Sequence, residues 1–249
     1  MKTINEIKQM SRSERYEINK TRRYDILNFL ADGEYFTTAE NIRILLNVNN
    51  ITYSRRILGS MCEDKLLTKT PLSFGGKARN FYSINQNGFI FLGVEDETRI
   101  IKLSHLTAYH NELVQRLKII THQLINDVAW YSEYTLKSEH QLRSYPDALL
   151  VVNDKKISIE LQRNLYSLKA FKSKIQKVIA DSHADKFSKV LYVCCDNLKA
   201  GKLKTLLNSV KTIKNSRNEE VALSDEIKSK LFDIIDYDEY RDFIKNLAG

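Results

Sequence analysis

The sequence predicts two domains that both mix helices and strands, the first of the α+β class and the second built around an α/β core. The chain has 249 residues, which suffices for two small domains. Three short helical patterns and then two strand-like segments occupy the first part of the chain, whereas helical and strand patterns alternate in the rest. We therefore predict one domain over residues 1–98 and a second over residues 99–249.

The composition is that of a globular protein that folds in the cytoplasm. Apolar residues make up 43% of the chain and charged residues 28%, so a packed core is expected. No apolar run approaches the ~20 residues that span a bilayer, and the charged opening residues do not resemble a secretion signal. The spacing of the three cysteines suits neither a disulfide framework nor a zinc finger, so we expect reduced thiols and no membrane partner.

The charge of the chain favours a polyanionic partner. The formal net charge is +8 and the isoelectric point is about 9.2. The positive excess lies in the first 200 residues, and the last 49 are balanced. A basic balance of this size suits nucleic-acid binding, although it also serves solubility.

Three helices are predicted in the first domain. A polar arm over residues 1–20, which can itself become helical, precedes a helix that carries apolar residues at positions 24, 26, 27 and 30 and stops at Gly33. Thr37 and Glu40 have the spacing of a capping box, which predicts a second helix from that point. A third helix follows from about Asn50, with Ile51, Leu58 and Met61 on its inner face.

A glycine-rich hairpin follows the third helix. The segments LLTKTPLSF and ARNFYSI have strand character, and GGKAR forms the turn between them. Three helices followed by a hairpin are typical of a winged-helix domain, whose third helix enters the major groove of double-stranded DNA. The expected DNA-binding residues are Thr52, Arg55 and Arg56 on the third helix and Lys77 and Arg79 on the hairpin. The alternative is a small helical subdomain whose hairpin contacts other proteins.

The second domain is predicted to follow the order helix, three strands, helix, strand. Residues 86–104 form a closing helix or linker, and an amphipathic helix carries Leu106, Tyr109, Leu113, Leu117, Ile120 and Leu124 on one stripe. The first strand is expected at the end of an irregular segment, WYSEYTLKSEHQL. Two further strands are expected in PDALLVV and ISIELQ. A helix with a stripe of Leu165, Leu168, Phe171, Ile175 and Val178 and the buried strand KVLYVCCDN follow. A C-terminal helical tail completes the domain.

Two acidic residues in this second domain suggest a metal site. Asp147 opens one strand and Glu160 lies on the next, and a hairpin through residues 153–155 would bring both carboxylates to the same edge of the sheet. Paired carboxylates can hold Mg²⁺ or Mn²⁺, which polarises a phosphodiester. Glu133 is a third acidic candidate, and Lys169 and Lys172 are candidates to neutralise phosphate charge. The alternative is that Pro-Asp opens a turn and Glu160 faces solvent.

These motifs resemble those of a known family of DNA-processing proteins. PD and ELQ in a helix–strand–strand–strand–helix–strand context are similar to the PD-(D/E)XK nuclease core. The order of winged helix, HNELV, WYSE, YPDALLVV and IELQRN with a following lysine-bearing helix resembles the replication-relaxation family, and within it the MobC-type plasmid mobilisation relaxases. The resemblance covers most of residues 20–195 and is one of overall pattern.

The resemblance implies a metal-dependent enzyme that nicks one DNA strand at a plasmid transfer origin, with other relaxosome proteins as partners. Asp147 and Glu160 match the two acidic motif positions, and Glu133 matches the upstream one less closely. Gln162 stands where the motif usually has lysine, so the charge must come from Lys169 or Lys172 or the site is impaired. Many winged-helix proteins act on inverted repeats as homodimers, although no long heptad pattern is present here.

Two alternatives to the enzyme remain open at this point. The first is a non-catalytic DNA-binding regulator of replication or transfer, whose nuclease-like domain is a degenerate scaffold, and Gln162 is the feature that favours it. The second is a C-terminal domain that binds a protein partner.

Overall fold

The chain forms two compact units that both mix helices and strands. A computed structural model describes residues 10–74, 76–94, 103–215, 217 and 219–248. The first unit is Met1–Ile119 and the second is Ile120–Gly249. The mixed α and β composition of both units confirms the broad fold class. None of the helices within the described ranges is long and apolar enough to cross a membrane.

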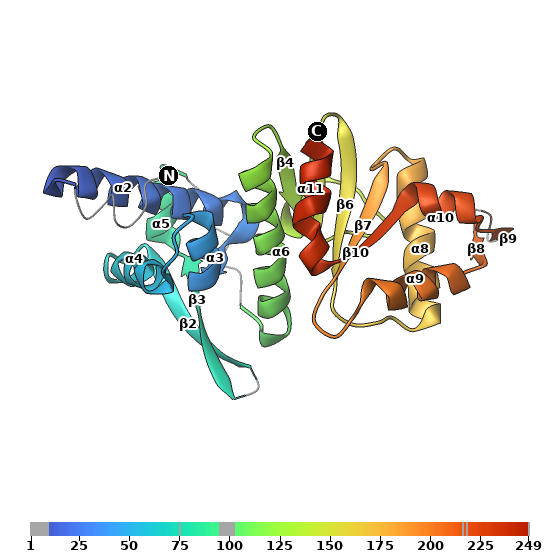
Figure 1. Ribbon diagram of the computed structural model, residues 1–249, viewed down its shortest axis with the longest axis horizontal. Coiled ribbons are helices and arrows are strands. Elements are labelled where there is room, and N and C mark those ends of the chain that lie inside the picture. Colours follow the sequence, from blue (N-terminus) through green and yellow to red (C-terminus); the bar gives the residue numbers. More distant parts are fainter. Residues whose placement is uncertain (1–9, 75, 95–102, 216, 218, 249) are drawn as a thin grey trace. The chain divides into compact units, whose positions relative to one another are not determined.

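The first unit packs helices against a three-stranded antiparallel sheet. Its helices are α2 (Arg12–Phe29), α3 (Ala39–Leu45), α4 (Ile51–Glu63) and α5 (Gln86–Phe91), with a π-helical turn at Leu30–Glu34 and the first part of α6 (His105–Leu124). Its strands are β1 (Phe36–Thr38), β2 (Leu67–Phe74) and β3 (Lys77–Ile84), in the order β1-β3-β2. The β2–β3 hairpin extends away from α3 and α4 (Figure 1).

Side-chain caps fix where α3 and α4 begin. The Asn50 side chain accepts a hydrogen bond from the backbone N–H of Thr52, so α4 begins where the sequence predicted. The predicted cap of α3 was wrong by one residue, because Thr38 and not Thr37 accepts from the N–H of Asn41. Thr37 is paired with Tyr82 in the β1–β3 ladder, so the chain is still extended there.

Helix α6 is joined to the first unit by buried polar side chains. Asn41 donates from Nδ2 to the backbone oxygen of Glu112 over 2.8 Å, and Gln115 donates to the backbone oxygen of Phe36. Lys118, whose side chain is 3% exposed, contacts Asp32 over 2.7 Å. These bonds tie successive turns of α6 to the sheet and to α3, which is why the first unit continues to Ile119, beyond the boundary expected at residue 98. Part of the linker expected over residues 86–104 lies outside the described residues.

The second unit is built on a five-stranded mixed sheet in the order β10-β7-β6-β5-β4. Its strands are β4 (Ala129–Ser132), β5 (Ala148–Val152), β6 (Lys155–Gln162), β7 (Lys189–Cys194) and β10 (Phe232–Asp236). Strands β4, β5 and β6 pair antiparallel, whereas β6, β7 and β10 pair parallel. Its other elements are α7 (Glu133–Glu139), α8 (Leu168–His183), α9 (Ala200–Ser209), α10 (Asp225–Leu231), α11 (Tyr240–Ala248), a 3₁₀ turn (Tyr237–Glu239) and the β8–β9 hairpin (Thr212–Lys214, Glu220–Ala222).

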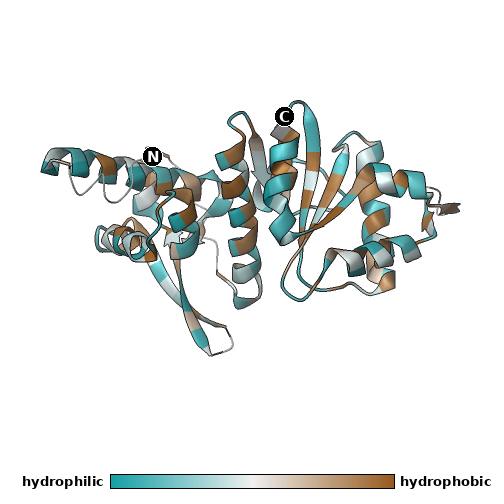
Figure 2. Cartoon of the chain, in the orientation of Figure 1, coloured by the Kyte–Doolittle hydropathy of each residue, from teal (hydrophilic) through white to brown (hydrophobic). Residues whose placement is uncertain are grey.

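A large hydrophobic core lies between this sheet and the helices on one of its faces. Helices α8, α9 and α10 lie on one side of the sheet and α11 on the other (Figure 1), and apolar colour runs along β6, β7 and β10 (Figure 2). Phe171, Ile175 and Val178 of α8 are buried in this core, as their spacing predicted. Leu165 and Leu168 are each 49% exposed, so the predicted stripe was wrong at its start. Ser167 caps α8, and the buried face begins one turn later.

Two segments of the second unit differ from the sequence prediction. WYSE enters β4 directly and the chain then forms α7, whereas an irregular segment passing into a strand was expected. The C-terminal tail was expected to be helical, but its residues Phe232–Asp236 form β10, which extends the sheet beside β7. β10 is held by main-chain pairing with a strand distant in sequence, a contact that local periodicity does not report.

The three cysteines are free thiols, as expected. Cys194 ends β7 and Cys195 follows it, and both are buried. Burial and the nearby Asp236 carboxylate raise the pKa of Cys194 to about 11, and burial and the nearby Asp196 raise the pKa of Cys195 to about 12. Both thiols are therefore protonated and unreactive at neutral pH.

Substitution of Gly88 by alanine should destabilise the first unit by about 2 kcal/mol through overpacking. A Cβ at Gly88 would lie 2.6 Å from the backbone oxygen of Leu66 and 2.6 Å from Cγ1 of Ile84. Gly59 in α4 is the matched control, because a Cβ there meets nothing within 4 Å and alanine favours a helix by roughly 1 kcal/mol. Thermal unfolding followed by circular dichroism measures both, and equal effects would contradict the packing at Gly88.

Candidate active site and nucleic-acid interface

The β5–β6 hairpin brings Asp147 and Glu160 together, as the sequence predicted. Asn153 and Asp154 form its turn with φ of 47° and 60°, the two positive values of a tight hairpin turn. Ala148 pairs with Ile159, so the preceding residue, Asp147, lies at the position opposite Glu160. The N–H of Leu161 donates to Oδ2 of Asp147 over 2.7 Å, which ties the Asp147 side chain to β6.

Glu160 points into the sheet face that α8 covers. Successive side chains of a strand alternate between faces, so Glu160 shares a face with Ser158 and Gln162 and lies beside its partner Tyr192 on β7. Its side chain is 5% exposed. A carboxylate this deeply buried needs a charged or hydrogen-bonding partner, and the alternative in which Glu160 faces solvent is therefore wrong.

Lys174 of α8 is that partner. Its Nζ lies 2.6 Å from Oε2 of Glu160 and 3.1 Å from the hydroxyl of Tyr166. Burial disfavours the charge on Lys174, but the Glu160 carboxylate and Tyr166 outweigh burial and raise the pKa of Lys174 above its usual range. Lys174 is consequently an ammonium ion at neutral pH, held between α8 and β6. Full burial, and after it the nearby Glu160 carboxylate, raise the pKa of the Tyr192 hydroxyl well above its usual value.

The other predicted site residues make different contacts. Gln162 donates its side-chain N–H to the backbone oxygen of Asn164. Lys172 contacts Thr212 and Glu220, and Lys169 is exposed on the first turn of α8. The Glu133 backbone N–H donates to the Asp147 backbone oxygen over 3.1 Å, but the Glu133 carboxylate pairs with Lys137 over 2.7 Å. The structure thus brings together Asp147, Glu160 and Lys174.

The sequence contains a signal for Lys174 that the prediction did not use. Lys174 is three residues after Phe171 and directly before Ile175, so it borders the apolar stripe of α8. Lys172 borders the same stripe on its other side, and Lys169 lies off it. The sequence therefore favours Lys172 and Lys174 over Lys169, and the structure distinguishes these two, because Lys174 contacts Glu160 whereas Lys172 contacts Thr212 and Glu220.

The two carboxylates are oxygen donors of the kind that Mg²⁺ and Mn²⁺ prefer. Among the described residues, no group of three or more His, Cys, Asp or Glu side chains is placed to hold a metal ion. Mg²⁺ is commonly held by one or two carboxylates together with substrate phosphates and water. Asp147, directly before β5, and Glu160 on β6 supply two such hard oxygen donors, a set that does not fit a closed structural metal site and could hold an ion only together with other ligands.

The predicted DNA-binding residues lie on α4 and on the β2–β3 hairpin. Thr52, Arg55 and Arg56 are exposed on α4, and the guanidinium of Arg56 lies 5.4 Å from the ring centre of Tyr53. Lys77 is exposed at the start of β3, beside the hairpin turn. Arg79 is only partly available, because its Nη1 lies 2.9 Å from Oε2 of Glu112 on α6 and its guanidinium lies over the Tyr109 ring.

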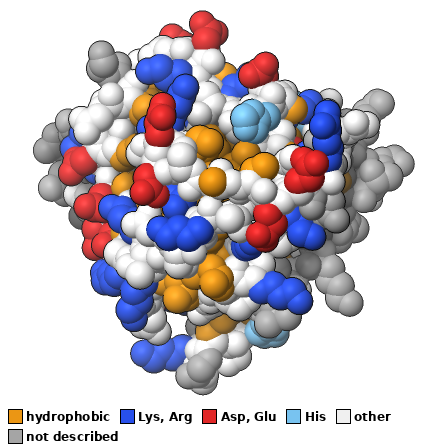
Figure 3. Space-filling model, turned by 90° about the vertical axis from the view of Figure 1, so that its right-hand side faces the viewer, with side chains coloured by type: hydrophobic (Ala, Val, Ile, Leu, Met, Phe, Trp, Pro, Cys, Tyr) orange, Lys and Arg blue, Asp and Glu red, His pale blue; other side chains and the backbone are white. Residues whose placement is uncertain are grey.

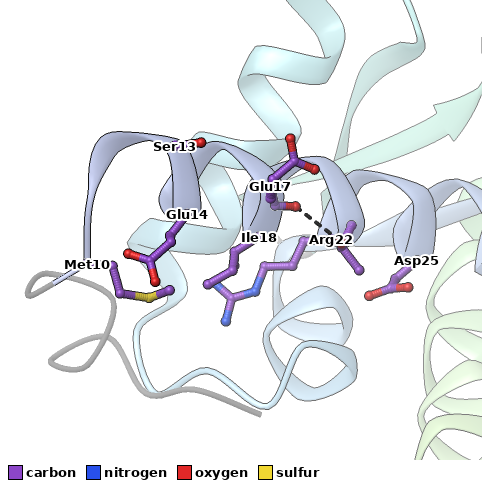
Figure 4. Close-up of a pocket in the computed structure, with 8 residues that line it drawn as sticks. Met10, Ser13, Glu14, Glu17, Ile18, Arg22 and Asp25 are labelled. Atoms are coloured by element: carbon purple, nitrogen blue, oxygen red, sulfur yellow. Dashed lines mark hydrogen bonds between the residues drawn. The ribbon is translucent and has the colours of Figure 1, made fainter.

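A cavity of about 490 Å³ lies along α2. Met10, Glu14 and Ile18 follow one another along the same side of the helix (Figure 4). Glu17, Arg22 and Asp25 also line the cavity, so its lining mixes apolar with mainly acidic side chains and does not suit a phosphate. On the face shown in Figure 3, basic side chains are interspersed with acidic ones around hydrophobic side chains, so charge does not mark that face for a polyanion.

Comparisons of the chain with models of known protein families, with curated proteins and with solved structures found no match.

Proposed function

We propose that this protein binds double-stranded DNA through its first unit and nicks one strand with its second. The observation that carries the proposal is the convergence of Asp147, Glu160 and Lys174, two carboxylates on paired strands and a lysine ammonium bound to one of them. As the resemblance to MobC-type relaxases implies, the proposed substrate is a plasmid transfer origin, with other relaxosome proteins as partners. The ion required is Mg²⁺ or Mn²⁺.

The order of elements in the first unit supports a winged helix. The order α2-β1-α3-α4-β2-β3 with a three-stranded antiparallel sheet supports this assignment. In such a domain α4 would enter the major groove and present Thr52, Arg55 and Arg56, and the hairpin would reach phosphates through Lys77. This binding would deliver the second unit to its site.

The second unit supports a PD-(D/E)XK nuclease-like core. Its order β4-β5-β6-α8-β7 follows the expected strands and helix, with α7 inserted after β4, whereas the helix expected before them, α6, lies mostly in the first unit. The lysine usually contributed by the strand is replaced by Gln162, and Lys174 supplies an ammonium to Glu160 from α8. A divalent ion held by Asp147 and Glu160 would polarise the phosphodiester and lower the pKa of a bound water. Lys174 would orient Glu160 and stabilise negative charge that develops on the phosphate.

A non-catalytic regulator is the second candidate, and one observation favours it. Lys174 already neutralises Glu160 over 2.6 Å in a buried ion pair, so Glu160 can be stable without any metal. In that case Asp147, Glu160 and Lys174 hold the second unit together, and DNA binding by the first unit is the whole activity.

A nicking assay separates the two candidates. The wild-type protein is first used to select its binding site from a pool of random-sequence duplexes, and the site is cloned into a supercoiled plasmid. We expect Mg²⁺ or Mn²⁺, but not a chelator, to support conversion to open circles. The variants D147N, E160Q and K174M should each nick at least ~100-fold more slowly, because each removes a group that holds or stabilises charge at the phosphate.

The controls identify which part of the proposal fails. Lys172 lies two residues before Lys174 but contacts Thr212 and Glu220. K172M should therefore nick DNA like the wild type. R55A combined with R56A should prevent selection of any site, because base-edge contacts specify the sequence. If the wild type selects a site but does not nick it under any metal condition, the regulator is correct. If no duplex is selected at all, DNA binding itself is wrong.

A further inference from the structure

An open cleft of about 460 Å³ lies within the first unit beside the predicted DNA-reading helix. It is bordered by the beginning of α3, by α4, by β3 and by α6. Three arginines from three different elements line it: Arg55 of α4, Arg79 of β3 and Arg116 of α6. Arg116 was not among the predicted DNA-binding residues, because α6 was assigned to the second domain.

A single buried carboxylate forms ion pairs with two of these arginines. Glu112 is 4% exposed, and its carboxylate lies 2.9 Å from Nη1 of Arg79 and 3.3 Å from Nη2 of Arg116. One negative charge cannot neutralise two guanidinium ions, and Arg55 adds a third positive charge to the lining. The other acid at the cleft, Glu40, is bound over 2.7 Å by Arg43, which does not line it. The cleft therefore carries a net positive charge.

The arginines keep different degrees of access to solvent. The side chain of Arg79 is 46% exposed and that of Arg116 is 23% exposed, although both contact Glu112. A guanidinium has five N–H donors in a planar fork that matches phosphate oxygens. Both can therefore meet a phosphate at the open side of the cleft, while Glu112 holds them in place from the buried side.

We propose that this cleft holds the phosphodiester backbone of one DNA strand, and that Arg116 of α6 is part of the DNA interface. The inference rests on the proposed DNA-binding function. The cleft lies between α4 and β3, the two elements assigned to the major groove and to phosphates, so a strand that contacts both passes over it. Glu112 limits the affinity of the cleft for the DNA backbone, since its carboxylate competes with the phosphate for Arg79 and Arg116.

The test measures binding of the full-length protein to a labelled mixed-sequence duplex of 24 base pairs over a series of NaCl concentrations. R116A should weaken binding severalfold and reduce the slope of log K against log salt by about 0.9, the value for one phosphate contact. E112Q should act in the opposite direction and tighten binding severalfold, because the arginines lose a competing charge. A purely structural role for Glu112 predicts that E112Q and R116A both weaken binding. K20A on the exposed surface of α2 is the charge-matched control for R116A and should leave the slope unchanged.

A second pair of variants leaves the Glu112 contacts intact, in case E112Q or R116A does not fold. Asn80 is exposed on β3 and lines the cleft, so N80D should weaken binding severalfold through repulsion of the phosphate. T68D places the same charge at an exposed position of β2 that does not line the cleft, and it should bind like the wild type. If the wild type binds the duplex but N80D and T68D bind equally well, the cleft is not the backbone site. If the wild type binds no duplex at low salt, the proposed function fails first.

Discussion

Replacement of Lys174 by methionine should lower the free energy of unfolding of the second unit by about 3–5 kcal/mol, the usual cost of breaking a buried ion pair. The substitution keeps much of the side-chain volume but leaves Glu160, 5% exposed, without its cation. It also removes the 3.1 Å contact with the Tyr166 hydroxyl. Chemical denaturation followed by tryptophan fluorescence measures this unit directly, because Trp130 on β4 is the sole tryptophan of the chain.

Lys172 provides the matched control on the same helix. Its pair with Glu220 is largely exposed, with side-chain exposures of 34% and 61%, so K172M should change stability by less than about 1 kcal/mol. The double variant K174M/E160Q should recover part of the loss, since no unpaired charge stays buried. Equal effects of K174M and K172M would mean that the Glu160 pair is not a buried one.

The pH dependence of the Lys174 contribution follows from the direction of its pKa shift. The pKa of Lys174 is higher in the folded chain than its usual value, so the ion pair stabilises fully below the ordinary lysine pKa and weakens only as the pH rises through the folded value. Titration of Lys174 should therefore add no pH dependence to the stability of the wild type between about pH 6 and pH 9, since the usual lysine pKa is about 10.4.

Local patterns in the sequence predicted the elements around both sites well. The cap at Asn50, the β2–β3 hairpin and the β5–β6 hairpin all depend on residues within a few positions of one another. The pairing of Asp147 with Glu160 followed from the hairpin alone. For such features the sequence contains all the information needed, because the interacting groups are close together in the chain.

Features that depend on distant residues could not be predicted in the same way. β10 was missed because it pairs with β7, far away in the sequence. Arg79 was assigned to phosphates without its partner Glu112, which lies 33 positions later on a helix assigned to the other domain. The lysine that meets Glu160 was sought by proximity in sequence, whereas the geometry of α8 against the sheet selects Lys174. These errors share one cause: partners that are distant in the sequence leave little trace in the local periodicity of either segment.

Replacement of Lys118 by methionine should destabilise the first unit by about 3 kcal/mol at pH 8. Its ammonium lies 2.7 Å from Asp32 and 3.3 Å from Glu34, and both Lys118 and Glu34 are buried. Asp32 is 69% exposed and tolerates the loss, whereas Glu34 would keep a buried charge without a cation. R43M, in a partly exposed pair with Glu40 within the same unit, is the control and should change stability by less than about 1 kcal/mol.

The K118M effect should depend on pH in a direction set by Glu34. Burial raises the pKa of Glu34 above its usual value, and Lys118 opposes that rise. A carboxyl whose pKa is raised by folding favours the folded state at pH values below its ordinary pKa, and this contribution is lost as the pH rises through the folded value. Without Lys118 the pKa of Glu34 rises further, so the destabilisation should grow from pH 5 to pH 8.

Hydrogen exchange of the amides of β1 and β3 at the two pH values measures the opening of this unit alone, with rates corrected for intrinsic exchange. A destabilisation that is the same at both values would show that Glu34 is not the group left uncompensated, and that α6 is held to the first unit by its other contacts.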